Sequence, residues 1–339
     1  MTLRLGLMGF GRIGRNVFRI ASQRNDVKVG GISDIANHEA LAYLLRFDSI
    51  YGRFEEPVRL SDGNLHVRSQ SIPMVSGKEP GDVPWGDMGV EIVIEATARY
   101  RSRAELERHL EAGAKRVVVC VPPSDKLDLT LVRGVNDHEL QSDHRIVSAG
   151  SCTANAVAPV LRTIHDSFGI RNGFLSAVHA YTNDQRVADV PHTDLRRSRA
   201  AAENIIPTDS NAAKAIGDAY PALRGRIQAA ALKVPVADGS VADLTLNLEK
   251  KATVEEINQV IYRVCVGPLH GVLRYETDPI VSRDIVQTPY SGIFDSLATM
   301  SMDSGLMKAL VWYDIGWGYA HRVLEICEAL SVLETEGRP

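Results

Sequence analysis

A glycine-rich turn near the N-terminus constrains the fold of this chain more than any other feature. Gly9, Gly11 and Gly14 follow an apolar run at residues 3–8, which predicts a strand, and precede a helical pattern that continues to about residue 22. The glycines allow a tight turn and the close approach of a pyrophosphate, which the N-terminus of the helix would bind. We therefore predict a dinucleotide-binding unit here, and a glycine turn in another kind of α/β protein is the alternative.

An acidic residue at the expected spacing indicates which dinucleotide would bind. A second predicted strand, residues 27–33, ends at Asp34, which lies twenty positions after Gly14. The Asp34 carboxylate would accept hydrogen bonds from the hydroxyls of the adenosine ribose. Ile35 and Ala36 offer no group that would bind a 2′-phosphate. The sequence thus predicts NAD, rather than NADP, as the cofactor.

A single cysteine carries the strongest sign of catalysis. Cys152 stands where a short apolar strand at residues 146–147 gives way to an apolar helix, predicted at about residues 153–166. At the N-terminus of a helix, unpaired backbone N–H groups and the helix dipole favour a thiolate over a thiol. His179, in a polar run further along the chain, is the candidate partner, because a thiolate paired with an imidazole is an activated nucleophile for carbonyl carbon. The alternative is a buried structural cysteine.

The alternation of strand and helix patterns predicts two domains. After the second strand we expect a helix at 40–47, a hairpin at 58–75 that turns at 62–64, a strand at 90–96, a helix at 103–112 and a strand at 116–121. That alternation is typical of a Rossmann-type, doubly wound α/β sheet. Beyond Cys152, longer alternating runs such as 230–234 and 241–246 favour an antiparallel sheet with helices on one face. We therefore predict an NAD-binding domain at residues 1–151 and an α+β catalytic domain at 152–316.

Composition agrees with a soluble cytoplasmic enzyme. A net charge of −4 gives no electrostatic argument for binding nucleic acid or a membrane. The four cysteines lack metal-ligand spacing, so no metal is expected, and free thiols suit a reducing compartment. The first strand begins so early that we expect no signal peptide, and no apolar run reaches the roughly 18 residues of a membrane span.

Together these motifs make the chain recognisable. Five stretches carry the resemblance: Gly9-Phe10-Gly11-Arg12-Ile13-Gly14-Arg15, Ser151-Cys152-Thr153, His179-Ala180-Tyr181-Thr182-Asn183-Asp184-Gln185, Asp194-Leu195-Arg196-Arg197 through Ile206-Pro207-Thr208, and Trp317-Gly318-Tyr319. Over nearly all of residues 3–330 the sequence resembles the phosphorylating (type I) glyceraldehyde-3-phosphate dehydrogenases, as a divergent member. The resemblance implies a homotetramer of glycolysis and gluconeogenesis. It also implies a C-terminal helix at about 317–334 that packs back on the NAD-binding domain, and a loop at 181–202 that packs between subunits near the cofactor.

The resemblance also implies a reaction and a set of site residues. Cys152 would attack the aldehyde of glyceraldehyde 3-phosphate, and His179 would take the hydroxyl proton as hydride passes to NAD. Inorganic phosphate would then convert the thioester reversibly to 1,3-bisphosphoglycerate. The implied cofactor residues are Gly9, Gly11, Arg12, Ile13, Gly14, Asp34, Lys78, Cys120 and Ile315. The implied residues for the attacking phosphate are Ser151, Thr153, Arg197, Ser210 and Asn211, and those for the substrate phosphate are Thr182 and Lys233.

Several positions depart from the family pattern. Ser210-Asn211 replaces the usual Thr-Gly, and Lys233 replaces an arginine, which keeps the charge but loses the bidentate fork. Ile315 and Met8 replace two asparagines of the family, which suggests a repacked nicotinamide pocket or a different orientation of the nicotinamide ring. These departures keep two alternative functions open. One is the oxidation of a related aldehyde phosphate such as erythrose 4-phosphate, with water in place of phosphate. The other is a catalytically weak paralogue with a redox-sensing or binding role.

Overall fold

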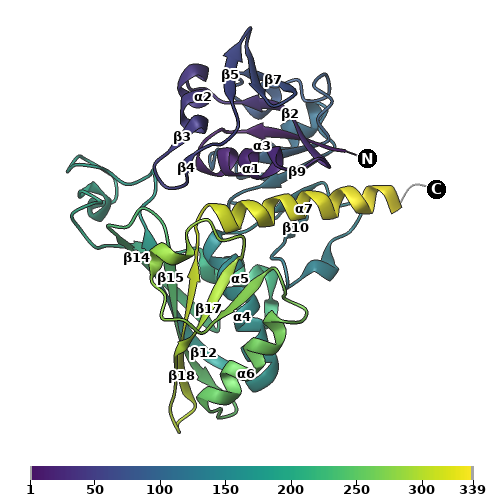
Figure 1. Ribbon diagram of the computed structural model, residues 1–339. Helices are drawn as coiled ribbons and strands as arrows, with labels where there is room; N and C mark the ends of the chain where they lie inside the picture. Colours follow the sequence, from purple (N-terminus) through teal and green to yellow (C-terminus); the bar gives the residue numbers. More distant parts are fainter. Residues whose placement is uncertain (1, 337–339) are drawn as a thin grey trace. The chain divides into compact units, whose positions relative to one another are not determined.

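The chain forms two compact units. The computed structural model describes residues 2–336, with side chains up to residue 333. The first unit takes in the chain up to Leu131, then His138–Gly150, and the chain from Ala320 onward. The second unit consists of Val132–Asp137 and Ser151–Tyr319. Figure 1 shows the elements of both units in the colours of the sequence.

A nine-stranded sheet forms the centre of the first unit. Its order is β10-β11-β9-β8-β1-β2-β7-β6-β5. The strands are β1 (Leu3–Met8), β2 (Val27–Ser33), β5 (Val58–Ser61), β6 (Asn64–Val67), β7 (Gln70–Val75), β8 (Ile92–Glu95), β9 (Arg116–Val119), β10 (Leu129–Thr130) and β11 (Ile146–Ser148). β1 pairs in parallel with both β2 and β8, and its Leu5 and Leu7 are completely buried. Such parallel strands are covered on both faces, which explains their nearly continuous apolar sequence.

Helices and short elements complete this unit. The helices are α1 (Arg12–Ser22), α2 (His38–Arg46), α3 (Arg103–Glu111) and α7 (Trp317–Glu336), whose first three residues fall in the second unit. Two short strands, β3 (Phe47–Asp48) and β4 (Gly52–Arg53), pair with each other. Two 3₁₀ turns, Pro80–Asp82 and Asp137–Glu139, lie in connecting segments. The Rossmann-type sheet predicted from sequence is therefore confirmed.

One predicted element of this unit is wrong. Residues 58–75 form a three-stranded antiparallel meander, β5-β6-β7, rather than one hairpin. The predicted turn at Asp62-Gly63 is present, but a second reversal follows at Arg68, which adopts a left-handed φ of 53°. Arginine rarely takes that conformation, so no glycine or asparagine marked the second turn in the sequence.

Steric limits explain two of the three glycines in the N-terminal turn. Gly9 has a φ of +93°, and a Cβ there would lie 2.8 Å from the backbone nitrogen of Thr97. A Cβ on Gly14 would lie 2.2 Å from the carbonyl oxygen of Gly9. β1, the turn and α1 can therefore pack this closely only with glycine at both positions.

The second unit is a seven-stranded sheet with helices on one face. Its order is β13-β14-β12-β15-β18-β17-β16, mainly antiparallel, with parallel pairs β12/β14 and β16/β17. The strands are β12 (Ile170–Ala180), β13 (Ile206–Asp209), β14 (Ile227–Val234), β15 (Ser240–Leu248), β16 (Leu273–Glu276), β17 (Gly292–Ser301) and β18 (Leu306–Tyr313). The helices are α4 (Cys152–Phe168), α5 (Ala212–Ala219) and α6 (Val254–Cys265), with 3₁₀ turns at Leu195–Ser198, Pro221–Leu223 and Ser282–Ile285.

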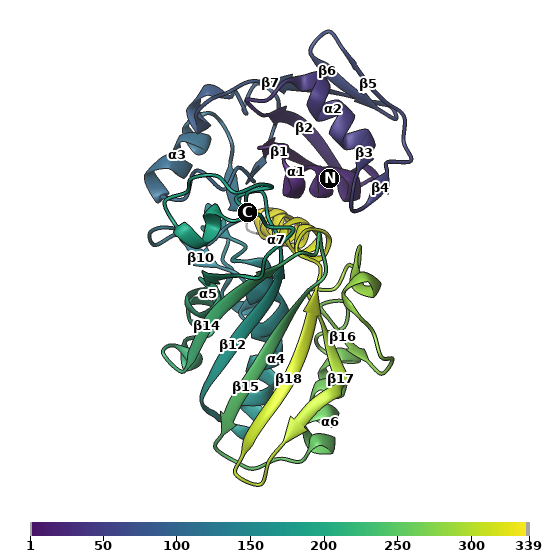
Figure 2. The same cartoon turned by 90° about the vertical axis from the view of Figure 1, so that its left-hand side faces the viewer.

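The sequence pattern of these strands explains the two-layer packing. Every second residue of β15 is buried, as expected for a sheet with one covered face. Figure 2 shows α4 and α6 behind the sheet, on the same side. On the open face, Phe174, Leu297 and Met300 keep 60% or more of their surface exposed. The predicted antiparallel catalytic sheet is thus confirmed.

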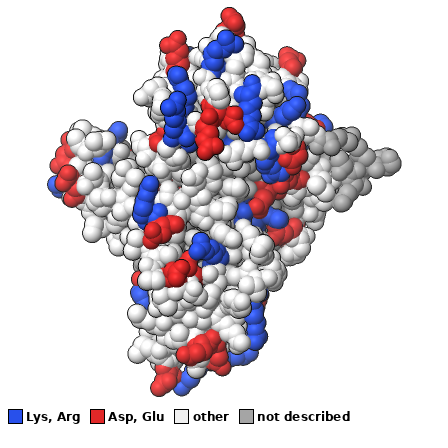
Figure 3. Space-filling model, in the orientation of Figure 1, with Lys and Arg blue, Asp and Glu red and all other residues white. Residues whose placement is uncertain are grey.

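Surface charge and hydropathy add two observations. Positive and negative side chains are interspersed over the face drawn in Figure 3, with no broad area of one sign. Within residues 2–336, no helix is both long enough and apolar enough to cross a membrane.

Candidate active site

The start of helix α4 positions Cys152. The helix begins at Cys152 itself, one residue earlier than predicted, and Ser151 is the N-cap with an extended backbone. The Ser151 hydroxyl accepts a hydrogen bond of 3.1 Å from the Ala154 N–H, which explains why the helix begins there. The following apolar residues are buried beneath the sheet, so the first turn holds the partly exposed thiol in a fixed place.

His179 lies next to this thiol, near the end of β12. The Cys152 Sγ and His179 Nε2 are 3.8 Å apart, and the imidazole is 8% exposed. The Nδ1 atom lies 2.7 Å from the Ala180 carbonyl oxygen. Because a carbonyl can only accept, the proton of the neutral ring belongs on Nδ1, and Nε2 presents its lone pair to the sulfur. The arrangement lets His179 take a proton from a group held at Cys152.

The pKa of the thiol differs from the prediction. Burial raises the pKa of Cys152 above its ordinary value, and the charge of Asp238 adds to that effect. The charge of Lys233 and hydrogen bonds from Thr153 act in the opposite direction without reversing it. The helix terminus therefore does not bring the pKa of this thiol below its ordinary value, because burial acts against it.

Lys233 contacts the imidazole directly. Strands β12 and β14 run in parallel with His179 opposite Lys233, so the two side chains extend from adjacent strands. The Lys233 Nζ lies 3.1 Å from His179 Nδ1, 3.5 Å from the Ala180 carbonyl oxygen and 3.3 Å from the Thr182 Oγ1. The two residues predicted for the substrate phosphate, Thr182 and Lys233, are thus neighbours.

Asp184 connects this pair to Arg197. The Thr182 hydroxyl donates to one Asp184 oxygen, and Arg197 Nη1 donates to the other at 2.7 Å. Arg197 Nε also lies 3.4 Å from Asp194. The hydrogen bond from Thr182 and the positive charges of Lys233 and Arg197 keep the pKa of Asp184 below its ordinary value, although partial burial acts to raise it. Sequence reasoning did not select Asp184, although its place two residues after Thr182 is typical of a local side-chain turn.

The other residues predicted for the attacking phosphate make contacts within their own segments rather than with one another. The Thr153 side chain is buried, and its hydroxyl is 2.9 Å from the Tyr313 hydroxyl. Ser210 accepts a 3.3 Å hydrogen bond from the Ala212 N–H at the start of α5. Asn211 is exposed and does not cap that helix with its side chain. Tyr313, which also contacts the His179 ring edge-to-face at 6.0 Å, was missed by sequence reasoning because β18 is remote in the chain.

Two buried carboxylates hold the segment around Ile315. The Asp238 Oδ1 accepts hydrogen bonds from the Gly239 and Ile315 N–H groups. Asp314 accepts from Gly316 and Trp317 through Oδ1, at 2.7 and 2.6 Å, and from Gln287 through Oδ2. Burial and the negative charge of Asp238 raise the pKa of Asp314 to about 7. The Ile315 side chain lies in the apolar core of the second unit, and Met8 in an apolar cluster of the first.

The first unit carries the residues predicted for the cofactor. A Cβ on Gly11 would meet no atom within 4 Å, in contrast to Gly9 and Gly14, so a close ligand accounts for glycine there. Arg12 and Ile13 begin α1, and the helix has no side-chain cap on its first N–H groups. Asp34 Oδ2 accepts from the Phe10 N–H at 2.7 Å. An anion-binding helix terminus beside a fixed carboxylate fits the pyrophosphate and ribose of NAD.

Two other predicted cofactor positions have less distinctive surroundings. Lys78 is exposed, and its carbonyl oxygen accepts a hydrogen bond from the Tyr100 hydroxyl. Cys120 follows β9 and is 8% exposed, and burial raises the pKa of its thiol.

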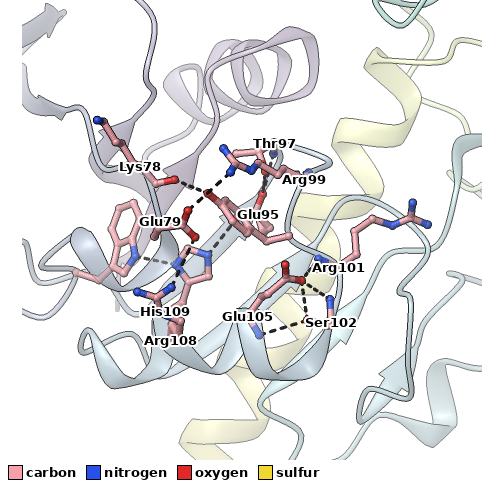
Figure 4. A network of polar contacts seen from close by, with 12 residues as sticks. Lys78, Glu79, Glu95, Thr97, Arg99, Arg101, Ser102, Glu105, Arg108 and His109 are labelled. Atoms are coloured by element: carbon pink, nitrogen blue, oxygen red, sulfur yellow. Dashed lines mark hydrogen bonds and ion pairs between the residues drawn. The ribbon is translucent and has the colours of Figure 1, made fainter. Parts of the chain in front are cut away.

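A row of buried, hydrogen-bonded side chains lies at the carboxyl end of β8 (Figure 4). The Trp85 indole N–H donates to His109 Nδ1 at 3.0 Å, and His109 Nε2 lies 3.1 Å from Glu95. Both His109 and Glu95 are completely buried. The other Glu95 oxygen accepts from the Thr97 N–H, whose nitrogen is the atom that approaches Gly9. No local pattern in the sequence indicates this network, because it joins side chains from three separate segments.

Known proteins of a single family match this chain over almost its whole length. Residues 3–103 match the family model "Glyceraldehyde 3-phosphate dehydrogenase, NAD binding domain", and residues 151–315 match the C-terminal domain of the same family. A glyceraldehyde-3-phosphate dehydrogenase of Geobacillus stearothermophilus is 43% identical over 332 residues, which cover 98% of this chain and 99% of the relative. The one from Mycobacterium leprae is 46% identical, covering 96% and 98%. The one from Borreliella burgdorferi is 44% identical, covering 97% and 99%.

Proposed function

The chain belongs to the glyceraldehyde-3-phosphate dehydrogenase family, and we propose that Cys152 and His179 carry out the phosphorylating oxidation of glyceraldehyde 3-phosphate with NAD. The observation that carries this proposal is the 3.8 Å approach of Cys152 Sγ to His179 Nε2. The nitrogen that faces the sulfur bears the lone pair, as a general base requires. No observation favours another aldehyde phosphate or a catalytically weak role.

The reaction follows from this geometry. His179 Nε2 takes the proton of the Cys152 thiol, and the thiolate adds to the aldehyde carbon as a C–S bond forms and the C=O π bond breaks. The imidazolium returns that proton to the oxygen, which becomes the hydroxyl of a thiohemiacetal. His179 Nε2 takes the hydroxyl proton while a hydride leaves the same carbon, which gives a thioester. The hydride passes to NAD, which is the chemistry that the cofactor supplies when bound. Inorganic phosphate attacks the thioester carbon, the Cys152 thiolate leaves, and 1,3-bisphosphoglycerate is released.

The direct test measures NADH formation from glyceraldehyde 3-phosphate with and without phosphate. Cys152→Ser should abolish the reaction, because a serine hydroxyl stays protonated at neutral pH. His179→Asn should lose on the order of 10²–10⁴ in rate, the usual contribution of a positioned acid–base group. Full activity in either variant would show that the roles are misassigned. NADH formed without phosphate would replace the phosphorylating reaction with hydrolysis of the thioester.

Two anion sites complete the proposal. Thr182 and Lys233 would bind the substrate phosphate, which is supported by the 3.3 Å between their polar atoms. Ser151, Thr153, Arg197, Ser210 and Asn211 would serve the attacking phosphate. Lys233→Arg should lower KM for glyceraldehyde 3-phosphate, since the arginine fork binds phosphate bidentately. Arg197→Met should instead raise the concentration of inorganic phosphate needed for half-maximal rate.

The cofactor would bind to residues 1–151, and residues 152–316 would catalyse the reaction, with the helix at 317–334 returning to the cofactor domain. Gly9, Gly11, Arg12, Ile13, Gly14 and Asp34 would form the main NAD contacts, with Lys78, Cys120 and Ile315 as further contacts. The open position of Gly11 and the fixed carboxylate of Asp34 support this assignment. The assignment can be tested by titrating the protein with NAD while tryptophan fluorescence is monitored. Gly11→Val should abolish NAD binding.

The assembled form would be a homotetramer in the cytoplasm. Val187 is 90% exposed and Leu195 is 81% exposed within the 181–202 loop, and the open sheet face adds Phe174, Leu297 and Met300. Apolar surface of this kind supports an interface between copies of the chain. Light scattering after gel filtration should give four times the chain mass. All four cysteines are free thiols, which supports a reducing compartment.

A further inference from the structure

We propose that Glu95 is a positioning residue of the cofactor site, because it holds the turn that follows β8, residues 96–99, in an unfavourable backbone conformation beside the glycine turn. The inference rests on the proposed binding of NAD at the glycine turn. Glu95 itself does not touch NAD, since its side chain is completely buried. It acts through Thr97 and Ala98, which lie in the turn after β8.

Sheet topology places this turn beside the cofactor site. β1 lies between β2 and β8 and pairs in parallel with both. The chain continues from β1 to one side of the sheet and later returns to the other side, so the strand order reverses at β1. In such sheets a ligand binds beyond the carboxyl ends of the strands, at the point of reversal. The glycine turn and the turn after β8 both lie there.

The two turns are in direct contact. The Ala96 N–H donates a hydrogen bond of 2.8 Å to the Met8 carbonyl oxygen. A Cβ on Gly9 would lie 2.8 Å from the backbone nitrogen of Thr97 and 2.9 Å from the carbonyl carbon of Ala96. A shift of the turn after β8 therefore moves the backbone against which Gly9 packs, and with it the groups that would bind the pyrophosphate.

The conformation of the turn is one that its sequence does not favour. Ala98 has a φ of +61°, in the left-handed region, where the Cβ of an L-residue crowds the following carbonyl oxygen. Residues of this kind persist where the surrounding structure holds them, and they are concentrated at functional sites. Ala98 is exposed, so packing on its methyl group does not hold it. The constraint comes from the hydrogen bonds of its neighbours.

Glu95 supplies that constraint through Thr97 (Figure 4). One carboxylate oxygen, Oε1, accepts hydrogen bonds from the Thr97 N–H, at 2.8 Å, and from the Thr97 hydroxyl. The Thr97 hydroxyl oxygen in turn accepts from the Arg99 N–H at 3.1 Å. The residues on both sides of Ala98 are therefore tied to one buried carboxylate, directly or through a single hydroxyl.

The second carboxylate oxygen is held by a histidine with a fixed tautomer. The Trp85 indole N–H can only donate, and it donates to His109 Nδ1 at 3.0 Å. The His109 proton therefore lies on Nε2, which is 3.1 Å from Glu95 Oε2. Thr97 and His109 thus both present donors to Glu95. An amide in the place of this carboxylate would turn its NH₂ group toward one of those donors.

The test measures the Kd for NAD by isothermal titration calorimetry, together with the melting temperature of the protein without NAD. Glu95→Gln should raise Kd at least about tenfold, because its NH₂ group meets a donor on either side. Thr97→Val keeps the shape of the side chain without the hydroxyl and should also raise Kd. Thr97→Ser retains the hydroxyl and should bind NAD as the wild type does.

A second substitution distinguishes positioning from a general loss of stability. Glycine adopts the left-handed conformation without the cost that alanine incurs, so Ala98→Gly should recover at least about threefold of the affinity lost in Glu95→Gln. A general loss of stability would not respond to the conformational preference of residue 98. If Glu95 serves only stability, the melting temperature falls while Kd stays at the wild-type value. A wild-type Kd in Thr97→Val overturns the proposal, even where Glu95→Gln fails to fold.

The matched control is Thr277→Val. Thr277 is an exposed threonine just after β16 in the second unit, and its N–H donates at 3.0 Å to Glu276, the last residue of that strand. This variant should leave Kd unchanged. Loss of binding in Gly11→Val with a wild-type Kd in Thr97→Val would overturn this inference alone. A wild-type Kd in Gly11→Val would overturn the proposed cofactor placement as well.

Discussion

The position of Asp34 leads to a prediction about cofactor choice. Its carboxylate is fixed from two sides, since Oδ2 accepts from the Phe10 N–H at 2.7 Å and Oδ1 from the Ala36 N–H at 2.9 Å. The carboxylate cannot turn away from a 2′-phosphate without breaking hydrogen bonds that hold the glycine turn. Asp34→Asn removes the charge while retaining one acceptor oxygen, so it isolates the electrostatic part of the discrimination.

The magnitude follows from the partial exposure of Asp34. Two unit charges about 4 Å apart repel by about 1 kcal/mol in bulk water and by about 4 kcal/mol at an effective dielectric constant near 20. A half-buried carboxylate lies between these limits. We expect NAD to exceed NADP in kcat/KM by at least about tenfold, or about 1.4 kcal/mol, and the ratio to fall by a similar factor in Asp34→Asn.

The assay is the initial rate of NADH or NADPH formation over a range of cofactor concentrations. The control variant is Asp62→Asn, which removes the same charge from an exposed turn of the same unit and should leave the ratio unchanged. Two results would refute the reasoning: equal kcat/KM for the two cofactors in the wild type, or an unchanged ratio in Asp34→Asn.

Three further predictions concern buried groups. Ile315→Asn should cost about 1–3 kcal/mol of unfolding free energy in urea, because its amide would enter an apolar core without a partner; tighter NAD binding at an unchanged melting temperature would contradict this. The folded-state pKa of Asp314 is raised to about 7, so the protonated carboxyl stabilises the fold fully below about pH 4, and that stability is lost as the pH rises through 7. The melting temperature should therefore fall from pH 6 to 8 less in Asp238→Asn than in the wild type, and an identical fall would exclude the carboxylate pair as its cause. His109→Phe should cost about 1–3 kcal/mol in the same urea titration by leaving the Trp85 N–H without its acceptor, whereas an unchanged midpoint would show that water replaces the imidazole.

Local sequence patterns were sufficient for much of this structure. The strand–glycine–helix pattern located Gly9, Gly11 and Gly14, and the short polar run before α4 located Cys152. These features depend on a few neighbouring residues, and their chemistry is apparent from residue type. The same kind of pattern identified β15 and the type of sheet that contains it.

Long-range pairing was beyond the reach of these patterns. The contact between His179 and Lys233 depends on the register of two strands more than fifty residues apart, which no local spacing encodes. Asp238 and Asp314 meet the Ile315 segment for the same reason. The pKa of Cys152 was mispredicted because the helix terminus is visible in the sequence while the desolvation of the thiol is a property of the folded unit.

The discontinuity of the first unit has a consequence for the order of folding during synthesis. Most of its sheet is built from the first 150 residues, but the unit also takes in the chain from Ala320 onward. Glu328, on α7, forms an ion pair with Arg24, just after α1. The ribosome therefore completes the catalytic unit while the cofactor unit still lacks a helix. We therefore expect the catalytic unit to reach its native structure first. A chain truncated before residue 320 should leave the N-terminal sheet with an uncovered apolar surface that chaperones would bind.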